Sequence, residues 1–303
     1  MKIRIGFGLG TQTLANDHGS FGDLVDALED LRFDSLWLSE RLTGDAPDPL
    51  VALSFAAGRT SRLKLGTSVL VLPGRNPVVL AKEMASLDRL SNGRFLPAVG
   101  LGAPSTVEQR AFGVGRKERA PWFDEALALM RRLWTEDDVH HDGERFHVDG
   151  LTLRPRPVQQ PIEVWLGGQA PSELRRVGRV GDGWLPSFAT VDDVEGGWAT
   201  VNETAAEHGR RIDAEHLGVL VSYAQDEIPE LMRHFLAQRL PDSDPAEVIP
   251  VGFDALRAHL EAMIRVGASK FVVMPLSPTP GWDSGDWTKE LTAVIDAVGD
   301  LQN

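Results

Sequence analysis

The sequence predicts an α/β fold, a (β/α)8 TIM barrel with insertions on its C-terminal rim, formed by residues 1–303 as a single domain. Eight short apolar runs alternate with amphipathic helical patterns, which is typical of a parallel sheet whose strands are joined by right-handed crossovers. Eight such repeats close most naturally into a barrel. The length of 303 residues suits one barrel, and no linker or low-complexity tract marks a second domain.

The predicted strands are short apolar runs, and the helices between them carry start and stop signals. In chain order the strands cover residues 3–9, 35–38, 63–72, 94–101, 162–166, 183–188, 216–223 and 270–276. The helix starts are Asp48-Pro49, Asn76-Pro77 and Pro121, and the helix stops are Asn92-Gly93 and Gly267. Each start places proline at or near the first helical turn, and each stop places glycine just beyond the last one.

Two segments depart from this alternation. Residues 139–153 contain two Asp-Gly turn signals around a short apolar run, which predicts an inserted β-hairpin that decorates the barrel rim. Residues 240–250 are rich in proline and aspartate, and they predict a loop of the kind that often closes over a substrate.

Composition limits the partners and the cellular location. The 44 acidic residues outnumber the 31 lysines and arginines, and the formal net charge of -13 disfavours nucleic acid, because phosphate backbones are bound by clustered cations. The absence of cysteine excludes disulfides, thiolate catalysis and Cys-ligated metal sites. No apolar run reaches the roughly 20 residues that span a bilayer, and the first residues resemble a strand and not a signal peptide. We expect a cytoplasmic protein with neither nucleic-acid nor membrane partners.

Three familiar site motifs are missing. None of the eight histidines forms an i, i+4 helical pair with a glutamate, so we expect no metal site. No Gly-x-Ser-x-Gly elbow is present. A dinucleotide-binding loop fails as well, because Thr13 stands where a third glycine should follow Gly8 and Gly10.

The candidate site is the C-terminal mouth of the barrel, where the residues that follow each strand converge. The candidate cofactor-binding residues at this mouth are Glu40, Ser68, Val69, Gly100, Gly102, Gly167, Gly168, Gln169 and Gly183. Repeated glycine at strand ends predicts close approach of a ligand to the backbone, although each glycine alone could belong to an ordinary turn. The Gly167-Gly168-Gln169 segment lies just before a predicted helix start at Pro171, which favours a phosphate site.

Several ordered motifs resemble luciferase-like monooxygenases and their F420-dependent relatives. The motifs are FDSLWLSER at 33–41, LGTSVLVLPGRNP at 65–77, ASLD at 85–88, LSNGRF at 90–95, PIEVWLGG at 161–168 and GDGWLP at 181–186. The resemblance covers nearly the whole chain. It implies a barrel mouth that holds a flavin or deazaflavin ring, with its phosphate near the glycines of the fifth strand, in a protein that is usually a homodimer.

The resemblance also assigns roles to residues. It implies that Glu40 lies beside the ring and that a strand-three bulge with a non-prolyl cis peptide, at Ser68-Val69, supports the ring face. Many relatives have histidine directly after the acidic residue, whereas this chain has Arg41, which cannot shuttle protons near neutral pH. Arg41 is therefore either a residue that orients an anionic substrate or a partner of Glu40 in an ion pair. Glu40 and Arg41 are the candidate catalytic residues, and no general acid is assigned.

The function that the resemblance implies is hydride transfer between coenzyme F420 and a small organic substrate. The acidic tail of F420 could lie over the basic residues Arg110, Arg116, Lys117 and Arg119, which could equally be a solvated loop. An FMN-dependent monooxygenase that uses reduced flavin and oxygen is the alternative. A barrel hydrolase that pairs Glu40 with a second carboxylate, and a non-catalytic coenzyme-binding protein, are more remote alternatives.

Overall fold

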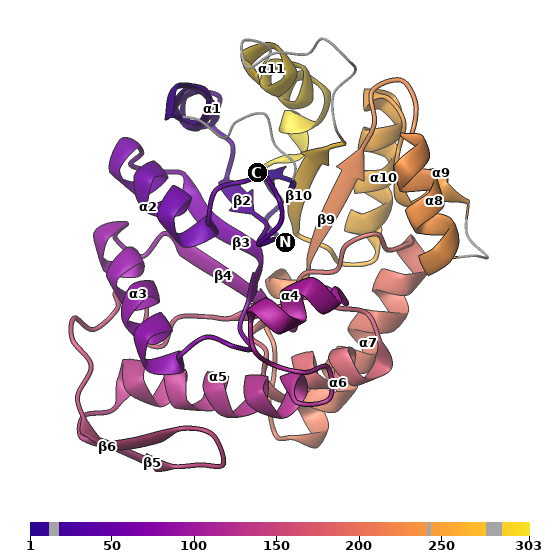
Figure 1. The fold of residues 1–303 in the computed structure, drawn as a ribbon. Coiled ribbons are helices and arrows are strands. Elements are labelled where there is room, and N and C mark those ends of the chain that lie inside the picture. The colour runs from indigo at the N-terminus through magenta and orange to yellow at the C-terminus, as the bar shows by residue number, and fades with distance from the viewer. Residues whose placement is uncertain (12–17, 241–243, 277–286) are drawn as a thin grey trace.

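The fold is a nearly closed parallel barrel surrounded by helices (Figure 1). The structure, a computed structural model, describes residues 1–11, 18–240, 244–276 and 287–303. The barrel strands are β1 (Arg4–Leu9), β2 (Ser35–Leu38), β3 (Lys64–Val71), β4 (Phe95–Gly100), β7 (Trp165–Leu166), β8 (Gly183–Trp184), β9 (Gly218–Tyr223) and β10 (Lys270–Pro275). They pair in the order β8-β7-β4-β3-β2-β1-β10-β9, and bridges from Trp184 to Leu217 and from Ser187 to Leu220 join the two outer strands. The predicted fold class is confirmed.

Two of the predicted strands are shorter than expected. The run over residues 162–166 contributes only β7, because the backbone N–H of Val164 donates to the Asp182 side chain, 2.9 Å away, and not to a neighbouring strand. The run over residues 183–188 contributes only β8, and Pro186 within it has no N–H to donate.

The helices pack around the outside of the barrel. They are α1 (His18–Asp30), α2 (Pro49–Arg59), α3 (Pro77–Leu90), α4 (Thr106–Ala111), α5 (Arg119–Thr135), α6 (Pro171–Val180), α7 (Val191–Glu207), α8 (Glu230–Arg239), α9 (Pro245–Val248), α10 (Phe253–Arg265) and α11 (Trp287–Val298), with 3-10 turns η1 (Ala214–His216) and η3 (Gly299–Leu301). The side chains of Asp48 and Asn76 cap α2 and α3 as predicted, each accepting two backbone N–H groups. Among the described residues, no helix is both long and apolar enough to cross a membrane.

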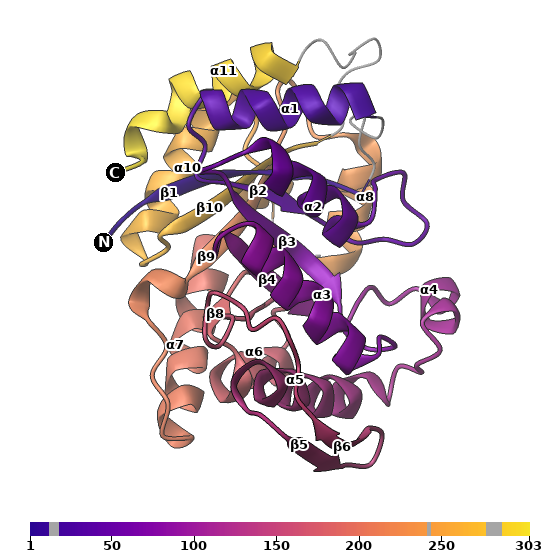
Figure 2. The ribbon, with the colours of Figure 1, turned by 90° about the vertical axis from the view of Figure 1, so that its left-hand side faces the viewer.

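The insertions lie partly where the sequence predicts. Helices α4, α8 and α9 follow strands β4 and β9, so they belong to the C-terminal rim. The predicted hairpin exists, as β5 (Val139–Asp142) paired antiparallel with β6 (His147–Leu151), but it follows a helix and packs along the outside of α5 (Figure 2). The predicted loop over residues 240–250 contains the short helix α9, and its residues 241–243 lie outside the described part of the chain.

The inside of the barrel is filled by aromatic and aliphatic side chains beneath the mouth. A separate apolar cluster consists of Trp37, Ala98, Trp165, Leu185, Leu220 and Val272. The indole of Trp37 occupies the space that a side chain at Gly66 would need, since a Cβ there would lie 2.3 Å from the ring. Glycine on β3 is therefore required by packing, and the barrel core ends just below the candidate site.

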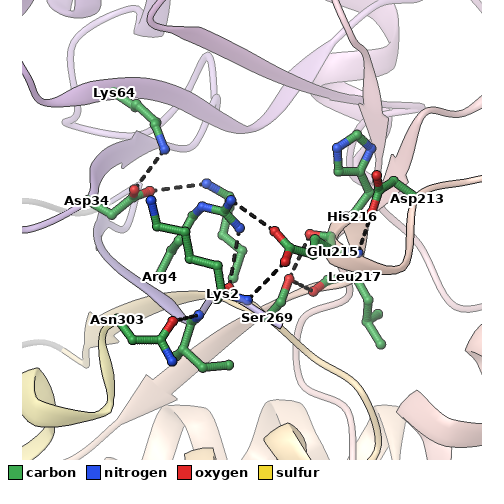
Figure 3. A network of polar contacts seen from close by, with 12 residues as sticks. Lys2, Arg4, Asp34, Lys64, Asp213, Glu215, His216, Leu217, Ser269 and Asn303 are labelled. Atoms are coloured by element: carbon green, nitrogen blue, oxygen red, sulfur yellow. Dashed lines mark hydrogen bonds and ion pairs between the residues drawn. The ribbon is translucent and has the colours of Figure 1, made fainter.

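The opposite end of the barrel, where the strands begin, is closed by charged side chains, and we call it the floor. The ammonium groups of Lys64 and Lys270 lie 2.8 and 3.1 Å from the carboxylate oxygens of Asp34. Arg4 pairs with Glu215 at 3.0 Å in the same network (Figure 3). Burial alone would raise the pKa of Asp34, but attraction to the two lysines outweighs it and lowers that pKa to about 2.

The two ends of the described chain meet at this floor. The side chain of Asn303 accepts the backbone N–H of Ile3 at 2.9 Å (Figure 3), and the side chain of Gln302 accepts that of Ile5 at 3.0 Å. The backbone N–H of Asn303 also donates to the carbonyl oxygen of Ile3. The last residues therefore extend the hydrogen bonding of β1 on the side of the barrel away from the mouth.

Candidate functional site

The mouth of the barrel contains two adjoining cavities. The first compartment, about 440 Å³, lies over β3, β4 and β7 and is bordered by Glu40, Val69, Gly100, Gly102, Gly167 and Gly168. The second compartment, about 600 Å³, lies between β10 and helix α8. Both are lined by Thr11, Ser39, Arg41, Ser68, Ser187, Leu220 and Phe235. Two molecules that react with one another could therefore lie side by side in this mouth.

The bulge predicted in β3 is present. The peptide bond between Ser68 and Val69 is cis, and the pairing of β3 with β4 shifts by one residue between Ser68 and Leu70. The Ser39 hydroxyl donates to the carbonyl oxygen of Ser68 at 2.9 Å and holds the bulge from the neighbouring strand. As a result the half-buried side chain of Val69 lines the first compartment.

The glycines at the mouth make room for the side chains of Val69 and Val71. A Cβ at Gly100 would lie 2.8 Å from a methyl carbon of Val69, and one at Gly167 would lie 3.1 Å from the other. A Cβ at Gly102 would lie 2.9 Å from a methyl carbon of Val71. These glycines line the first compartment and also make room for two valine side chains, and Val69 presents a small apolar surface to the cavity. Their predicted contact with a cofactor stays a prediction.

The predicted phosphate site before α6 already holds an anion of the protein. The carboxylate of Glu173 accepts the backbone N–H groups of Gln169 and Ala170, both at 3.0 Å. Gly168 has a φ of 99°, which favours glycine, and a Cβ there would lie 2.6 Å from the same carboxylate. The Glu173 carboxylate, which was not predicted, thus occupies the N–H groups expected to bind a phosphate, and glutamate three residues into a helix is a known capping pattern.

Gly183 and Gln169 lie apart from the other predicted binding residues, since neither lines the two compartments. A Cβ at Gly183 would lie 2.5 Å from the indole of Trp165, so this glycine is required by the barrel core. Gln169 donates its side-chain amide to the carbonyl oxygen of Ser187 and holds two rim segments together.

Glu40 lies at the edge of the first compartment, as predicted, and its carboxylate is fixed. Its side chain is only 4% exposed. One carboxylate oxygen accepts the backbone N–H of Val71 at 2.6 Å, and the other pairs with Arg75. Burial raises the pKa of Glu40, while Arg75 and the Val71 N–H oppose the rise. Of the two alternatives for Arg41, the ion pair with Glu40 is not the one formed, because Glu40 pairs with Arg75.

Arg41 forms an ion pair with a residue that the sequence analysis missed. Its Nε donates to the carboxylate of Glu108 at 2.9 Å, and the Thr43 hydroxyl donates to the same oxygen. The side chain of Glu108 is 2% exposed, whereas that of Arg41 is 39% exposed and lines both compartments. Glu108, on α4 after β4, thus adds a buried acidic residue beside the barrel mouth.

The four basic residues proposed to contact an acidic coenzyme tail differ in burial. Arg119 is buried and donates to the carbonyl oxygens of Gly102 and Ala103, so it holds the loop after β4. Arg110, Arg116 and Lys117 are exposed. Among described residues, the structure gathers no group of three or more histidine, aspartate or glutamate side chains suited to a metal.

The mouth as a whole suits a flat ring in one compartment and a second molecule beside it. The apolar Val69 side chain lines the first compartment, and the edge of this compartment carries the fixed carboxylate of Glu40 and the guanidinium of Arg41. Arg176 also lines this compartment, and its charge is balanced by Asp124 at 2.9 Å. Such a site binds through shape and oriented hydrogen bonds more than through net charge.

Comparison with known proteins gives consistent matches. The family described as luciferase-like monooxygenase matches residues 2–261. An F420-dependent glucose-6-phosphate dehydrogenase of Gordonia bronchialis is 30% identical over 244 residues, which cover 76% of this chain and 71% of that protein. A protein of the same name from Kineococcus radiotolerans is 34% identical over 177 residues, or 55% of this chain, and there the chain spans about half (52%) of the relative's length.

The solved structures agree in fold. The monooxygenase RslO1 from Streptomyces bottropensis superposes with a TM-score of 0.80 at 21% identity, covering 99% of each chain. At this identity the likeness concerns the arrangement of helices and strands.

Proposed function

Because the chain belongs to the luciferase-like monooxygenase family, we propose that it is an F420-dependent oxidoreductase, which transfers a hydride between the deazaflavin coenzyme F420 and a small organic substrate. The relatives named above, 30% and 34% identical, both carry F420 in their names. The observation that carries the proposal is the first compartment, where a β-bulge presents Val69 as an apolar surface against which a ring could lie.

The residues of the first compartment fit such a coenzyme. Val69 would contact the ring face, and Gly100 of β4 and Gly167, directly after β7, leave room for its side chain. When bound, F420 supplies a ring carbon that gives or accepts the hydride. The side chains of Arg176 and Arg239 line the compartment and would meet the phosphate-bearing chain, because the backbone N–H groups after Gly168 are taken by Glu173.

The chain's own residues would position the reactants and exclude water. Glu40, fixed by Arg75 and by the Val71 N–H, offers a carboxylate of defined orientation at the ring edge. Arg41 lies between the two compartments and can donate hydrogen bonds to either occupant. Orientation of this kind is the main contribution of a protein to cofactor chemistry. The catalytic roles of Glu40 and Arg41 remain proposals.

The proposal is tested by titrating the protein with F420 and, separately, with FMN, and following quenching of tryptophan fluorescence. We expect tighter binding of F420. Equal affinity for the two coenzymes would overturn the assignment. Titration of a Val69→Asp variant should show at least about tenfold weaker F420 binding, because a charge would stand where the ring needs an apolar surface.

The alternative function is an FMN-dependent monooxygenase that uses reduced flavin and oxygen. The fold shared with a structure named as a monooxygenase favours this alternative. Tighter binding of FMN, together with substrate-dependent oxygen consumption, would support it. The homodimer and the cytoplasmic location expected from the sequence likewise remain predictions, which gel filtration and cell fractionation would test.

A further inference from the structure

We propose that the second compartment binds a neutral, mainly apolar substrate that carries a single hydrogen-bonding oxygen, and that it rejects sugar phosphates. This inference rests on the proposed function, since it takes the first compartment as the coenzyme site. It differs from what the names of the relatives suggest, because those proteins are called glucose-6-phosphate dehydrogenases.

The walls of the second compartment are largely apolar. They include Phe188, Leu231, Met232, Phe235, Met274 and Leu276. Leu231 and Phe235 on α8 are 77% and 41% exposed in the absence of a ligand, although both border a cavity. Large apolar side chains left exposed around a cavity are typical of a ligand-binding groove. An apolar ligand would remove them from water.

The backbone at Phe188 supports the same conclusion. Phe188 has a φ of 54°, a conformation that bulky residues rarely adopt. The ring lines the second compartment and packs edge-on against Phe235, with ring centroids 5.5 Å apart. Strained backbone that persists is often found where a side chain has a functional position. The backbone at Phe188 thus places this ring on the wall of the second compartment, against Phe235 of α8.

The charges in the second compartment do not suit a phosphate. Arg41 is the single lysine or arginine that lines it, and Glu108 already balances that charge at 2.9 Å. The residues outside the described part of the chain, 12–17, 241–243 and 277–286, contain no lysine or arginine. His234 on the wall has its own partner, Gln238, at 2.8 Å. A phosphate dianion would therefore lose hydration without meeting an unpaired cation.

Arg41 still has donors to offer to a neutral oxygen. Glu108 engages its Nε, and the two terminal nitrogens have no hydrogen-bond partner among the described residues. A carbonyl or hydroxyl oxygen of the substrate could accept from them at the boundary between the compartments. Because the Arg41–Glu108 pair carries no net charge, it would favour a neutral polar group over an anion.

The test uses the F420-loaded protein and two probes, cyclohexanone and glucose 6-phosphate, with binding followed by saturation-transfer NMR. We expect binding of cyclohexanone and none of glucose 6-phosphate. Leu231→Asp should weaken cyclohexanone binding about tenfold, because it places a charge on the apolar wall. F420 affinity should not change, since Leu231 lines only the second compartment. Leu90→Asp on α3 is the matched control, because Leu90 is 80% exposed and lines neither cavity.

A second variant tests the role of charge. Glu108→Gln leaves Arg41 without a counter-charge, so this variant should give a saturation-transfer signal with glucose 6-phosphate that the unaltered protein lacks. Tighter binding of glucose 6-phosphate than of cyclohexanone to the unaltered protein would overturn the inference, and so would a Leu231→Asp variant that binds cyclohexanone normally. Failure of F420 to bind, with cyclohexanone binding intact, would instead overturn the proposed function alone.

Discussion

The two ends of the barrel use charge in different ways. At the floor, the carboxylate of Asp34, 13% exposed, pairs with two lysines, and the Lys270 side chain is only 6% exposed. At the mouth, Arg41 and Arg75 pair with the buried carboxylates of Glu108 and Glu40, and the two arginine side chains stay 39% and 22% exposed. The most enclosed charge at the floor is therefore the Lys270 ammonium, whereas at the mouth the enclosed charges are the carboxylates of Glu40 and Glu108, and Arg41 lines the cavities.

We infer from this difference that residues at the floor contribute mainly to stability and residues at the mouth mainly to binding. In parallel barrels the residues at the strand ends form the site, and those at the strand starts contribute to stability. We therefore expect substitutions at the floor to change the free energy of unfolding with little change in coenzyme affinity. Substitutions at the mouth should change coenzyme affinity with little change in the free energy of unfolding. Four predictions examine this separation.

The largest effect is expected from Asp34→Asn. It leaves the buried ammonium of Lys270 without a counter-charge, and breaking a buried pair in this way typically costs about 3–5 kcal/mol of unfolding free energy. Urea denaturation at pH 7 measures the loss. F420 affinity of the folded variant should match that of the unaltered protein, and a tenfold change would contradict the separation. Asp30→Asn, at an exposed position, is the control.

Lowering the pH should reduce the free energy of unfolding of the unaltered protein through protonation of Asp34 at the floor. The pKa of Asp34 is lowered from 3.8 to about 2. A lowered carboxyl pKa adds stability that is present above the unfolded value and is lost as the pH falls through the folded value. The protein should thus lose about 2 kcal/mol of unfolding free energy between about pH 4 and pH 2 from this residue. Comparison of the pH dependence with that of Asp34→Asn isolates the contribution, and parallel curves would refute it.

At the mouth, Gly100→Ala should weaken F420 binding about tenfold, or about 1.4 kcal/mol. Its new methyl group would lie 2.8 Å from a methyl carbon of Val69 and would displace that side chain from its position in the first compartment. Fluorescence titration measures the affinity. If F420 bound as tightly as before, Val69 would not be the surface on which the ring rests.

The smallest effect should come from Gly58→Ala in α2. A Cβ at Gly58 meets no atom within 4 Å, so alanine should fit without strain. Alanine in a helix is favoured over glycine by about 0.5–1 kcal/mol, and thermal denaturation should show that gain. Coenzyme affinity should stay constant. This variant also serves as the matched control for Gly100→Ala, because the same chemical change is made where space is free.

The fold could be predicted from the sequence because its signals are local. Apolar runs marked all eight strands, and Asp48 and Asn76 marked two helix starts that the structure confirms. The start predicted at Pro121 differs from the structure, in which α5 begins two residues earlier, at Arg119. The hairpin was predicted, but its position along α5 depends on tertiary contacts such as that between Trp122 and Phe146.

The candidate site was predicted only in part because its pairings join distant segments. Glu40 and the bulge at Ser68-Val69 lie where expected, but the partners Arg75 and Glu108 are brought in by the closure of the barrel. Nothing in the local sequence distinguishes Arg75 from other arginines. One signal was overlooked: Glu173 follows the glycines at the spacing of a helix cap.

The hydrogen bonds that tie Gln302 and Asn303 to β1 suggest that the barrel can be circularly permuted. With both ends of the described chain at the floor, a short glycine-rich linker could join them, and new ends could be opened at the exposed Glu144 in the hairpin turn. The permuted barrel would keep its mouth intact. A protein of this kind could be attached to a surface through its hairpin, with no tether near the cavities.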